Sequence, residues 1–271
     1  MAACHRSRAG DRRDADVRAA HRGVQALSGP VLFCGDPHGQ FGHIVRAAQQ
    51  LKACAVVLLG DLQPTRPLHL ELGPIADRTW FIHGNHDTDS EEGFRNVWDS
   101  GMADRNLHGR VATLPDGTRV AGLGGVFRER VWYPPGDARF NNHEAHLNAT
   151  GPWDRWRDGP PLRHWSSIYP EVVAELAAME ADVLVTHEAP ACHPNGFALI
   201  DDLARAMRVR ALFHGHHHDR LDYSEGWPKL GFRAFGVGLR GITRLDGAPV
   251  VTGELDLIRW YRRPRFVEEL E

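Results

Sequence analysis

The sequence predicts an α/β fold in which two mixed sheets face each other and helices lie outside them. Short apolar runs typical of buried strands alternate with helix-length segments in the first part of the chain. Three polar residues lie just beyond such runs, namely Asp36, Asp61 and Asn85. Asp36 and Asp61 are 25 positions apart, and Asp61 and Asn85 are 24 apart, which is about the length of one strand–helix–strand unit. Further along, Pro115-Asp116-Gly117 lies between two strand-like segments and is typical of a hairpin. Strands that alternate with helices and are followed by hairpins favour two packed sheets.

Each expected element follows from its local pattern. Residues 1–25 are rich in Arg, Ala and Asp without apolar spacing, so we expect a flexible or helical tail before a single domain over 26–271. Pro170 indicates the first turn of a helix, because its fixed φ suits that position. The expected helices are 41–52, 169–179 and 197–207. The expected strands are 31–35, 53–60, 79–84, 110–114, 118–122, 183–186, 211–214, 232–240 and 248–256. We assign the last two strands to the second sheet.

The composition is that of an ordinary globular domain. Hydrophobic residues make up 42% and charged residues 25% of the 271 positions. A net charge of −3 offers no general attraction for nucleic acid or anionic membranes. The longest apolar stretch, 53–59, is far too short to span a bilayer. We therefore expect neither a membrane nor a nucleic acid as partner, and the sequence leaves the oligomeric state open.

The cysteines indicate a reducing compartment. Cys4, Cys34, Cys54 and Cys192 form no CxxC pair, and Cys34 and Cys54 lie inside strand-like runs. A cysteine in such a run is typically a small core residue. We expect a cytoplasmic protein, because disulfides are rare in that compartment.

Donor-rich motifs follow five of the apolar runs. The motifs are Asp36-Pro37-His38-Gly39, Gly60-Asp61, Gly84-Asn85-His86-Asp87, Thr186-His187-Glu188 and Gly215-His216-His217-His218. Parallel strands end at a common edge of their sheet, so these motifs should converge. The candidate ligands are Asp36, His38, Asp61, Asn85, His187, His216 and His218. They are too many for one ion and about enough for two, and a set without thiolate suits divalent Mn, Fe or Zn.

Two of the motifs place their donors two residues apart. Asp36 and His38 form one pair, and His216 and His218 form the other. Residues i and i+2 of an extended segment point the same way, so we expect each pair to face one pocket. His217 would then point away from the ligands.

In their order and spacing, these motifs resemble the calcineurin-like metallophosphoesterases. Asp-x-His, Gly-Asp, Gly-Asn-His-Asp, a lone His and Gly-His-x-His follow one another between about residues 31 and 218. The resemblance implies a four-layer α/β/β/α sandwich with two divalent metal ions as cofactors. It implies one ion on Asp36, His38 and His218, the other on Asn85, His187 and His216, and Asp61 bridging both.

The resemblance also implies metal-dependent hydrolysis of phosphate esters. Two cations about 3.5–4 Å apart share a water and lower its pKa, and the bridging hydroxide attacks phosphorus in line. His86 would be the catalytic acid, a role that imidazole suits near neutral pH. Asp87 would orient the His86 ring or raise its pKa. No nucleophilic side chain is needed, so we expect no covalent intermediate.

Departures from the family pattern narrow the substrate class. Many members carry Gly-Asp-x-x-Asp followed by Arg, whereas this chain has Gly60-Asp61-Leu62-Gln63-Pro64. The missing Asp-Arg element argues against a protein phosphatase. We expect small-molecule phosphodiesters or monoesters as substrates. Because one phosphate-binding charge is missing, we expect diesters to be hydrolysed at least as well as monoesters. A nuclease, a protein phosphatase and a non-catalytic scaffold are the alternatives.

Residues 124–167 have no counterpart among the motifs and form an expected insert. Four tryptophans argue against disorder, namely Trp132, Trp153, Trp156 and Trp165. Two interpretations stay open: a lid or substrate wall over the metals, or a surface excursion packed by its own tryptophans. We expect His143 and His146 of this segment to pack rather than to bind substrate, whereas Glu188 could orient an imidazole ligand.

Overall fold

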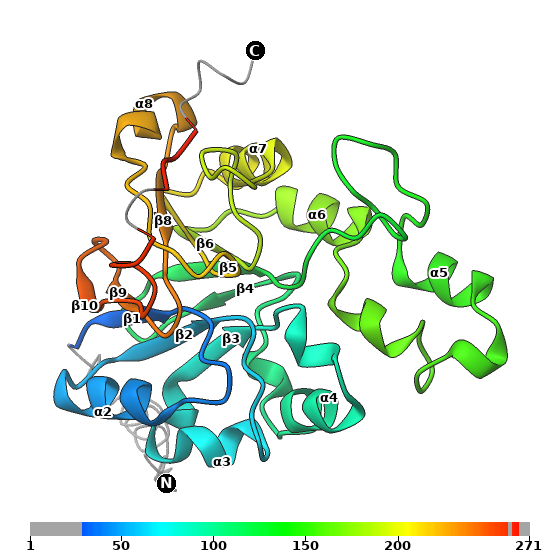
Figure 1. Cartoon of the computed structure of the whole chain (residues 1–271), viewed down its shortest axis with the longest axis horizontal. Helices are drawn as coiled ribbons and strands as arrows, with labels where there is room; N and C mark the ends of the chain where they lie inside the picture. The colour runs from blue at the N-terminus through cyan, green and yellow to red at the C-terminus, as the bar shows by residue number, and fades with distance from the viewer. Residues whose placement is uncertain (1–28, 260–261, 266–271) are drawn as a thin grey trace, which may run out of the picture.

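The computed structural model describes residues 29–259 and 262–265 and contains two five-stranded sheets (Figure 1). The expected tail at 1–25 lies outside the described residues. The strands are β1 Val31–Cys34, β2 Ala55–Leu59, β3 Thr79–Ile82, β4 Arg110–Thr113, β5 Arg119–Leu123, β6 Val183–Thr186, β7 Ala211–His214, β8 Arg233–Gly236, β9 Ile242–Arg244 and β10 Pro249–Val251. The helices are α2 Gly42–Gln50, α3 Leu68–Leu72, α4 Glu91–Trp98, α5 His143–Ala149, α6 Pro170–Ala177, α7 Ala198–Ala206 and α8 Trp227–Leu230.

The first sheet has the strand order β10-β9-β1-β2-β3. β1, β2 and β3 are parallel, and their continuous apolar runs are buried on both faces. β9 and β10 add an antiparallel extension at the β1 edge. The assignment of 248–256 to the second sheet was therefore wrong. The turn at Asp246 and Gly247 folds β10 back onto β9, and β9 pairs with β1.

The second sheet has the strand order β4-β5-β6-β7-β8. β4 and β5 form the predicted hairpin, with Arg110 opposite Gly122. β5, β6, β7 and β8 are parallel, so the C-terminal ends of β6 and β7 lie together.

The two sheets pack face to face, and alternate residues of each strand divide between an inner and an outer core. Phe33 of β1 stacks on Phe213 of β7 across the sheets, with ring centroids 3.9 Å apart. Its neighbour Leu32 points the other way and packs with α2, α3 and α4. Leu212 of β7 packs outward with α6 and α7. The predicted four-layer α/β/β/α sandwich is thereby confirmed (Figure 1).

Two helices of the first half, α3 and α4, were missing from our sequence assignment. α4 carries a recognisable start, because Ser90 accepts a hydrogen bond from the Gly93 N–H at 3.0 Å and two acidic residues follow it. α3 has five residues and follows Pro67, too short for a periodic pattern. Among the helices of the described residues, none is long and apolar enough to cross a membrane.

The segment 124–167 contains α5 and extends to the side of the two sheets, next to α4 and α6 (green in Figure 1). Trp156 and Trp165 pack against Phe94 of α4, with ring centroids 5.8 and 5.1 Å away. His146 is buried and its Nδ1 lies 2.8 Å from the hydroxyl of Tyr169. These contacts pack two of the four tryptophans onto the domain, whereas Trp153 is exposed, and both interpretations of the segment stay open.

Candidate metal centre

The predicted ligands lie at the C-terminal ends of strands in both sheets. Asp36 follows β1, Asp61 follows β2 and Asn85 follows β3. From the second sheet, His187 follows β6 directly and the Gly215–His218 motif follows β7. Because the sheets face each other, these ends meet at one edge. The contacts below join six of the seven side chains, and the seventh, Asp36, lies outside both donor groups with its Oδ1 atom 3.8 Å from Nδ1 of His187.

The first group of donors consists of His38, Asp61 and His218. The Nε2 atoms of His38 and His218 lie 3.0 Å apart. The Oδ2 atom of Asp61 is 3.9 Å from the Nε2 atom of His38. One donor atom from each of the three residues lies within 4.8 Å of the others, as ligands of one ion require.

A second group consists of Asp61, His187 and His216, again within 4.8 Å. The His187 Nε2 atom is 3.4 Å from Asp61 Oδ1 and 3.2 Å from Asn85 Oδ1. Asp61 is thus common to both groups, with Oδ1 towards one and Oδ2 towards the other.

Asp36 supplies the clearest test of whether these residues fit a cation. Its side chain is fully buried, and Oδ1 accepts a hydrogen bond from the His216 N–H at 3.0 Å. Oδ2 is buried and has no hydrogen-bond partner. Burial raises the pKa of Asp36 to about 7. A buried carboxylate oxygen without a partner is costly, and a bound cation would remove that cost.

Two imidazoles are oriented by acceptors outside the donor groups. The Nδ1–H of His187 donates to the Leu59 carbonyl oxygen at 2.7 Å. The Nδ1 atom of His38 lies 2.5 Å from the Oε1 atom of Gln63, which accepts from it. Both rings therefore turn Nε2 inward, towards the other donors, and in a neutral ring that carries its proton on Nδ1 this is the nitrogen that binds metal.

The backbone at the ligands is strained. Five of the seven have positive φ: Asp36 at 38°, His38 at 41°, Asp61 at 48°, His216 at 69° and His218 at 60°. The pairs Asp36/His38 and His216/His218 converge as expected, but our reason for it was wrong, because these segments are not extended. Left-handed conformations of non-glycine residues cost about 1–3 kcal/mol each and concentrate at functional sites.

Close packing around the ligands requires glycine at two positions. A Cβ on Gly84 would overlap the backbone N and Oδ1 of Asp61 and lie 2.7 Å from Cε1 of His187. Gly60 has a φ of 98°, and a Cβ there would overlap the His187 ring.

His86 lies beside the donor groups and is partnered by a residue that we did not predict. Its Nδ1 atom is 2.6 Å from Oδ2 of Asp89, and its backbone N–H donates to Asp61 Oδ1 at 2.9 Å. Burial acts to lower the pKa of His86, but Asp89 and Asp61 raise it above the ordinary value. Asp89 follows His86 by three residues on a helical turn, a spacing at which two side chains can meet, so the sequence could have suggested this pair.

Asp87 has a different role from the one that we expected. Its buried carboxylate accepts hydrogen bonds from the N–H groups of Gln63 and Gly84, both at 2.8 Å. It therefore ties together the two loops that carry Asp61 and Asn85, while Asp89 contacts the His86 ring.

Asp61 and His187 form a charge pair in the centre. Burial opposes both charges, yet the imidazolium of His187 holds the pKa of Asp61 below its ordinary value. Reciprocally, Asp61 and Asp36 raise the pKa of His187 to about 10 against the effect of burial. The carboxylates thus favour a positive charge at this position, which a proton or a metal ion can supply.

His217 and Glu188 flank the centre. The His217 ring stacks on His193 with centroids 3.9 Å apart, in keeping with a residue outside the two donor groups that share Asp61. Glu188 accepts a hydrogen bond from the Phe127 N–H at 3.0 Å. Glu188, His216 and His217 form a third set of potential donors. The carboxylate of this set, that of Glu188, belongs to neither of the two donor groups that share Asp61.

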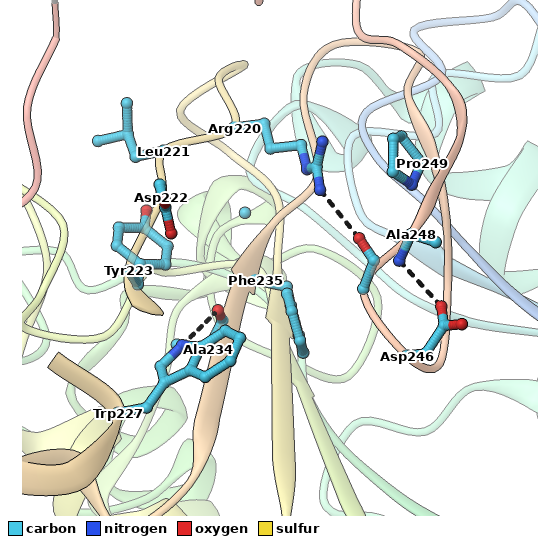
Figure 2. Close-up of a pocket in the computed structure, with 12 residues that line it drawn as sticks. Arg220, Leu221, Asp222, Tyr223, Trp227, Ala234, Phe235, Asp246, Ala248 and Pro249 are labelled. Carbon is cyan, nitrogen blue, oxygen red and sulfur yellow. Dashed lines mark hydrogen bonds between the residues drawn. The ribbon is translucent and has the colours of Figure 1, made fainter. Parts of the chain in front are cut away.

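A separate cavity of about 550 Å³ lies between β8 and the β9–β10 turn (Figure 2). The Arg220 guanidinium donates to the Gly247 carbonyl at 2.9 Å, and the Trp227 indole donates to Ala234 at 3.3 Å. None of the predicted site residues lines this cavity, so it takes no part in the metal centre.

Known proteins resemble the chain in sequence and in fold. The family model described as calcineurin-like phosphoesterase matches residues 29–220, which include all five motifs. An uncharacterized protein of Haemophilus influenzae (strain ATCC 51907 / DSM 11121 / KW20 / Rd) is 42% identical over 218 residues, or 80% of this chain and 94% of that protein. The crystal structure of TT1561 of Thermus thermophilus aligns with a TM-score of 0.50 at 15% identity, covering 80% of this chain and 95% of that one. This last likeness concerns the fold alone.

Proposed function

Because this chain belongs to the calcineurin-like phosphoesterase family, whose members hydrolyse phosphoric esters with the help of metal ions, we propose that it cleaves small-molecule phosphate esters at a dinuclear centre. The supporting observation is that two groups of potential ligands have Asp61 in common. In this proposal Asp36, His38 and His218 hold one ion, Asn85, His187 and His216 hold the other, and Asp61 bridges them. The oxygen and nitrogen donors fit Mn, Fe or Zn.

Bound metal ions would supply an activated water and neutralise the phosphoryl oxygens. The side chains of this chain provide the positioning and the proton. Asp89 holds Nδ1 of His86 and leaves Nε2 for the substrate. From there His86 donates a proton to the leaving oxygen, a step that general acids accelerate by about 10²–10⁴-fold. Asp87 fixes the loops of Asp61 and Asn85 relative to each other.

The proposed substrate is a small phosphate ester, and the proposed location is the cytoplasm. Cys34, Cys54 and Cys192 are free and buried in the described part of the chain, which suits a reducing compartment. The chain's net charge of −3 does not favour a nucleic acid as substrate.

A panel assay in Mn²⁺ tests the function. We expect turnover of p-nitrophenyl phosphate, bis-p-nitrophenyl phosphate or a cyclic nucleotide, and loss of that turnover after chelation. Cleavage of single-stranded DNA in preference to all of these would favour the nuclease instead. A protein that binds Mn²⁺ and hydrolyses none of them would favour the scaffold.

A further inference from the structure

Arg128 is a half-buried cation that the metal centre described above does not use. It lies in the segment 124–167, and its Nη2 atom donates to Ser166 Oγ at 3.0 Å. Its Nε atom is buried and has no hydrogen-bond partner. Within residues 29–259 and 262–265, no carboxylate forms an ion pair with this arginine at 4.0 Å or less. A desolvated guanidinium in this state is suited to receive an anion.

Contacts on both sides hold Arg128 next to the catalytic loops. The N–H of the preceding residue, Phe127, donates to Glu188 at 3.0 Å, and Glu188 follows His187. The Ser166 hydroxyl that anchors Arg128 lies 2.6 Å from Thr88 Oγ1, and Thr88 is two residues after His86. Arg128 is therefore fixed between two of the segments that build the metal centre.

The charges around Arg128 agree with this placement. Burial, followed by the charge of Arg163, lowers the pKa of Arg128 to about 10, so the side chain remains a cation at neutral pH. The negative charges of Asp89, Glu188 and Asp61 act in the opposite direction. The guanidinium thus lies within electrostatic range of the proposed bridging carboxylate.

We propose that Arg128 binds the phosphoryl oxygens of the substrate and replaces the arginine of the Asp-Arg element, which is missing here because the chain has Pro64-Thr65 at those positions. The proposal rests on the proposed function and adds to it a residue that binds the phosphate group. A guanidinium can bind two phosphoryl oxygens at once through its fork of N–H groups. The guanidinium favours a monoester dianion over a diester monoanion. The proposal therefore reverses our expectation that diesters are hydrolysed at least as well as monoesters.

The test compares Arg128→Met and Arg128→Lys with Arg139→Met, which removes one exposed arginine from the same segment. The measurements are kcat and KM for p-nitrophenyl phosphate and for its bis-ester, and the affinity of the Mn²⁺-loaded protein for inorganic phosphate by calorimetry. Loss of a charge-assisted hydrogen bond predicts that Arg128→Met weakens phosphate binding and lowers monoester kcat/KM by about 10- to 100-fold. The diester should lose less, Arg128→Lys should be intermediate, and Arg139→Met should stay within about twofold of wild type.

Melting temperature and Mn²⁺ content separate binding from structure. If Arg128→Met fails to fold, Arg128→Lys must still lose more activity on the monoester than on the diester. Equal losses on both esters, or phosphate affinity in Arg128→Met equal to that of Arg139→Met, would overturn the role of Arg128. If the wild type hydrolyses no ester at all, the proposed function fails, and the phosphate titration still decides about Arg128.

Discussion

The Nε2 atoms of His38 and His218 lie 3.0 Å apart although 180 positions separate the two residues in the chain. Two nitrogen ligands about 2.1 Å from one ion, at roughly a right angle, are also ~3.0 Å apart. The Gln63 Oε1 atom lies 2.5 Å from Nδ1 of His38 and can only accept from it, so this contact orients the ring with Nε2 towards His218. The spacing therefore fits the proposal that these two residues bind one ion.

Asp61→Asn should abolish both metal binding and turnover. The carboxylate gives one oxygen to each donor group, and the amide removes the negative charge that opposes the repulsion between two cations. Elemental analysis after gel filtration measures the metal, with the exposed Asp137→Asn as control. Retention of two metal equivalents by Asp61→Asn would contradict the bridging role.

His86→Ala should keep the metal and lose rate by roughly 10²–10⁴-fold, as expected for a general acid. Asp89→Asn should fall between wild type and His86→Ala, because it removes the negative charge beside Nδ1 and leaves the ring in place. Metal content and kcat are measured on the same samples. If His86→Ala loses metal as completely as Asp61→Asn does, His86 is a ligand rather than an acid.

The sequence predicted the sheets and the gathering of the ligands well because both depend on local patterns. Buried strands such as Ala55–Leu59 are continuous apolar runs, and donors directly after parallel strands must share an edge. The strand Pro249–Val251 could not be assigned to its sheet in this way, since three residues carry no information about their pairing partner.

Side-chain partnerships were the part that the sequence did not reveal. Asp87 and Asp89 both lie within three residues of His86, and only the turn of the backbone decides which carboxylate reaches the ring. The contacts of Arg128 depend on Ser166 and Glu188, which lie 38 and 60 positions further along the chain. No periodicity relates such positions.

Gly84→Ala should weaken metal binding by about 10- to 100-fold, in the range seen when the supports of metal ligands are changed. The added Cβ would overlap Asp61 and approach Cε1 of His187 to 2.7 Å, so the ligands must move. Gly226→Ala is the matched control, because its φ is −81° and its Cβ would meet only Leu230 Cδ1 at 4.0 Å. Titration with Mn²⁺ compares the two, and equal affinities would show that the ligand loops tolerate the extra methyl group.

His164→Asn should make the metal-free protein less sensitive to acid. Burial, aided by the neighbouring His146, lowers the pKa of His164 in the fold to about 4, compared with about 6.5 in an unfolded chain. As the pH falls from 6.5 towards 4, His164 binds a proton in the unfolded chain but not in the folded chain, so the free energy of unfolding decreases. The wild type should therefore lose about 1 kcal/mol relative to His164→Asn between pH 6.5 and 5, a figure that allows for screening by solvent.

Asparagine can keep the hydrogen bond to Ser167 Oγ, which lies 2.9 Å from Nδ1, so the two proteins should differ by a constant amount above pH 7. Urea unfolding at each pH measures the difference, with His69→Asn as the control for a histidine in solvent. A difference that does not change with pH would mean that His164 takes up its proton as readily in the folded protein as in the unfolded one.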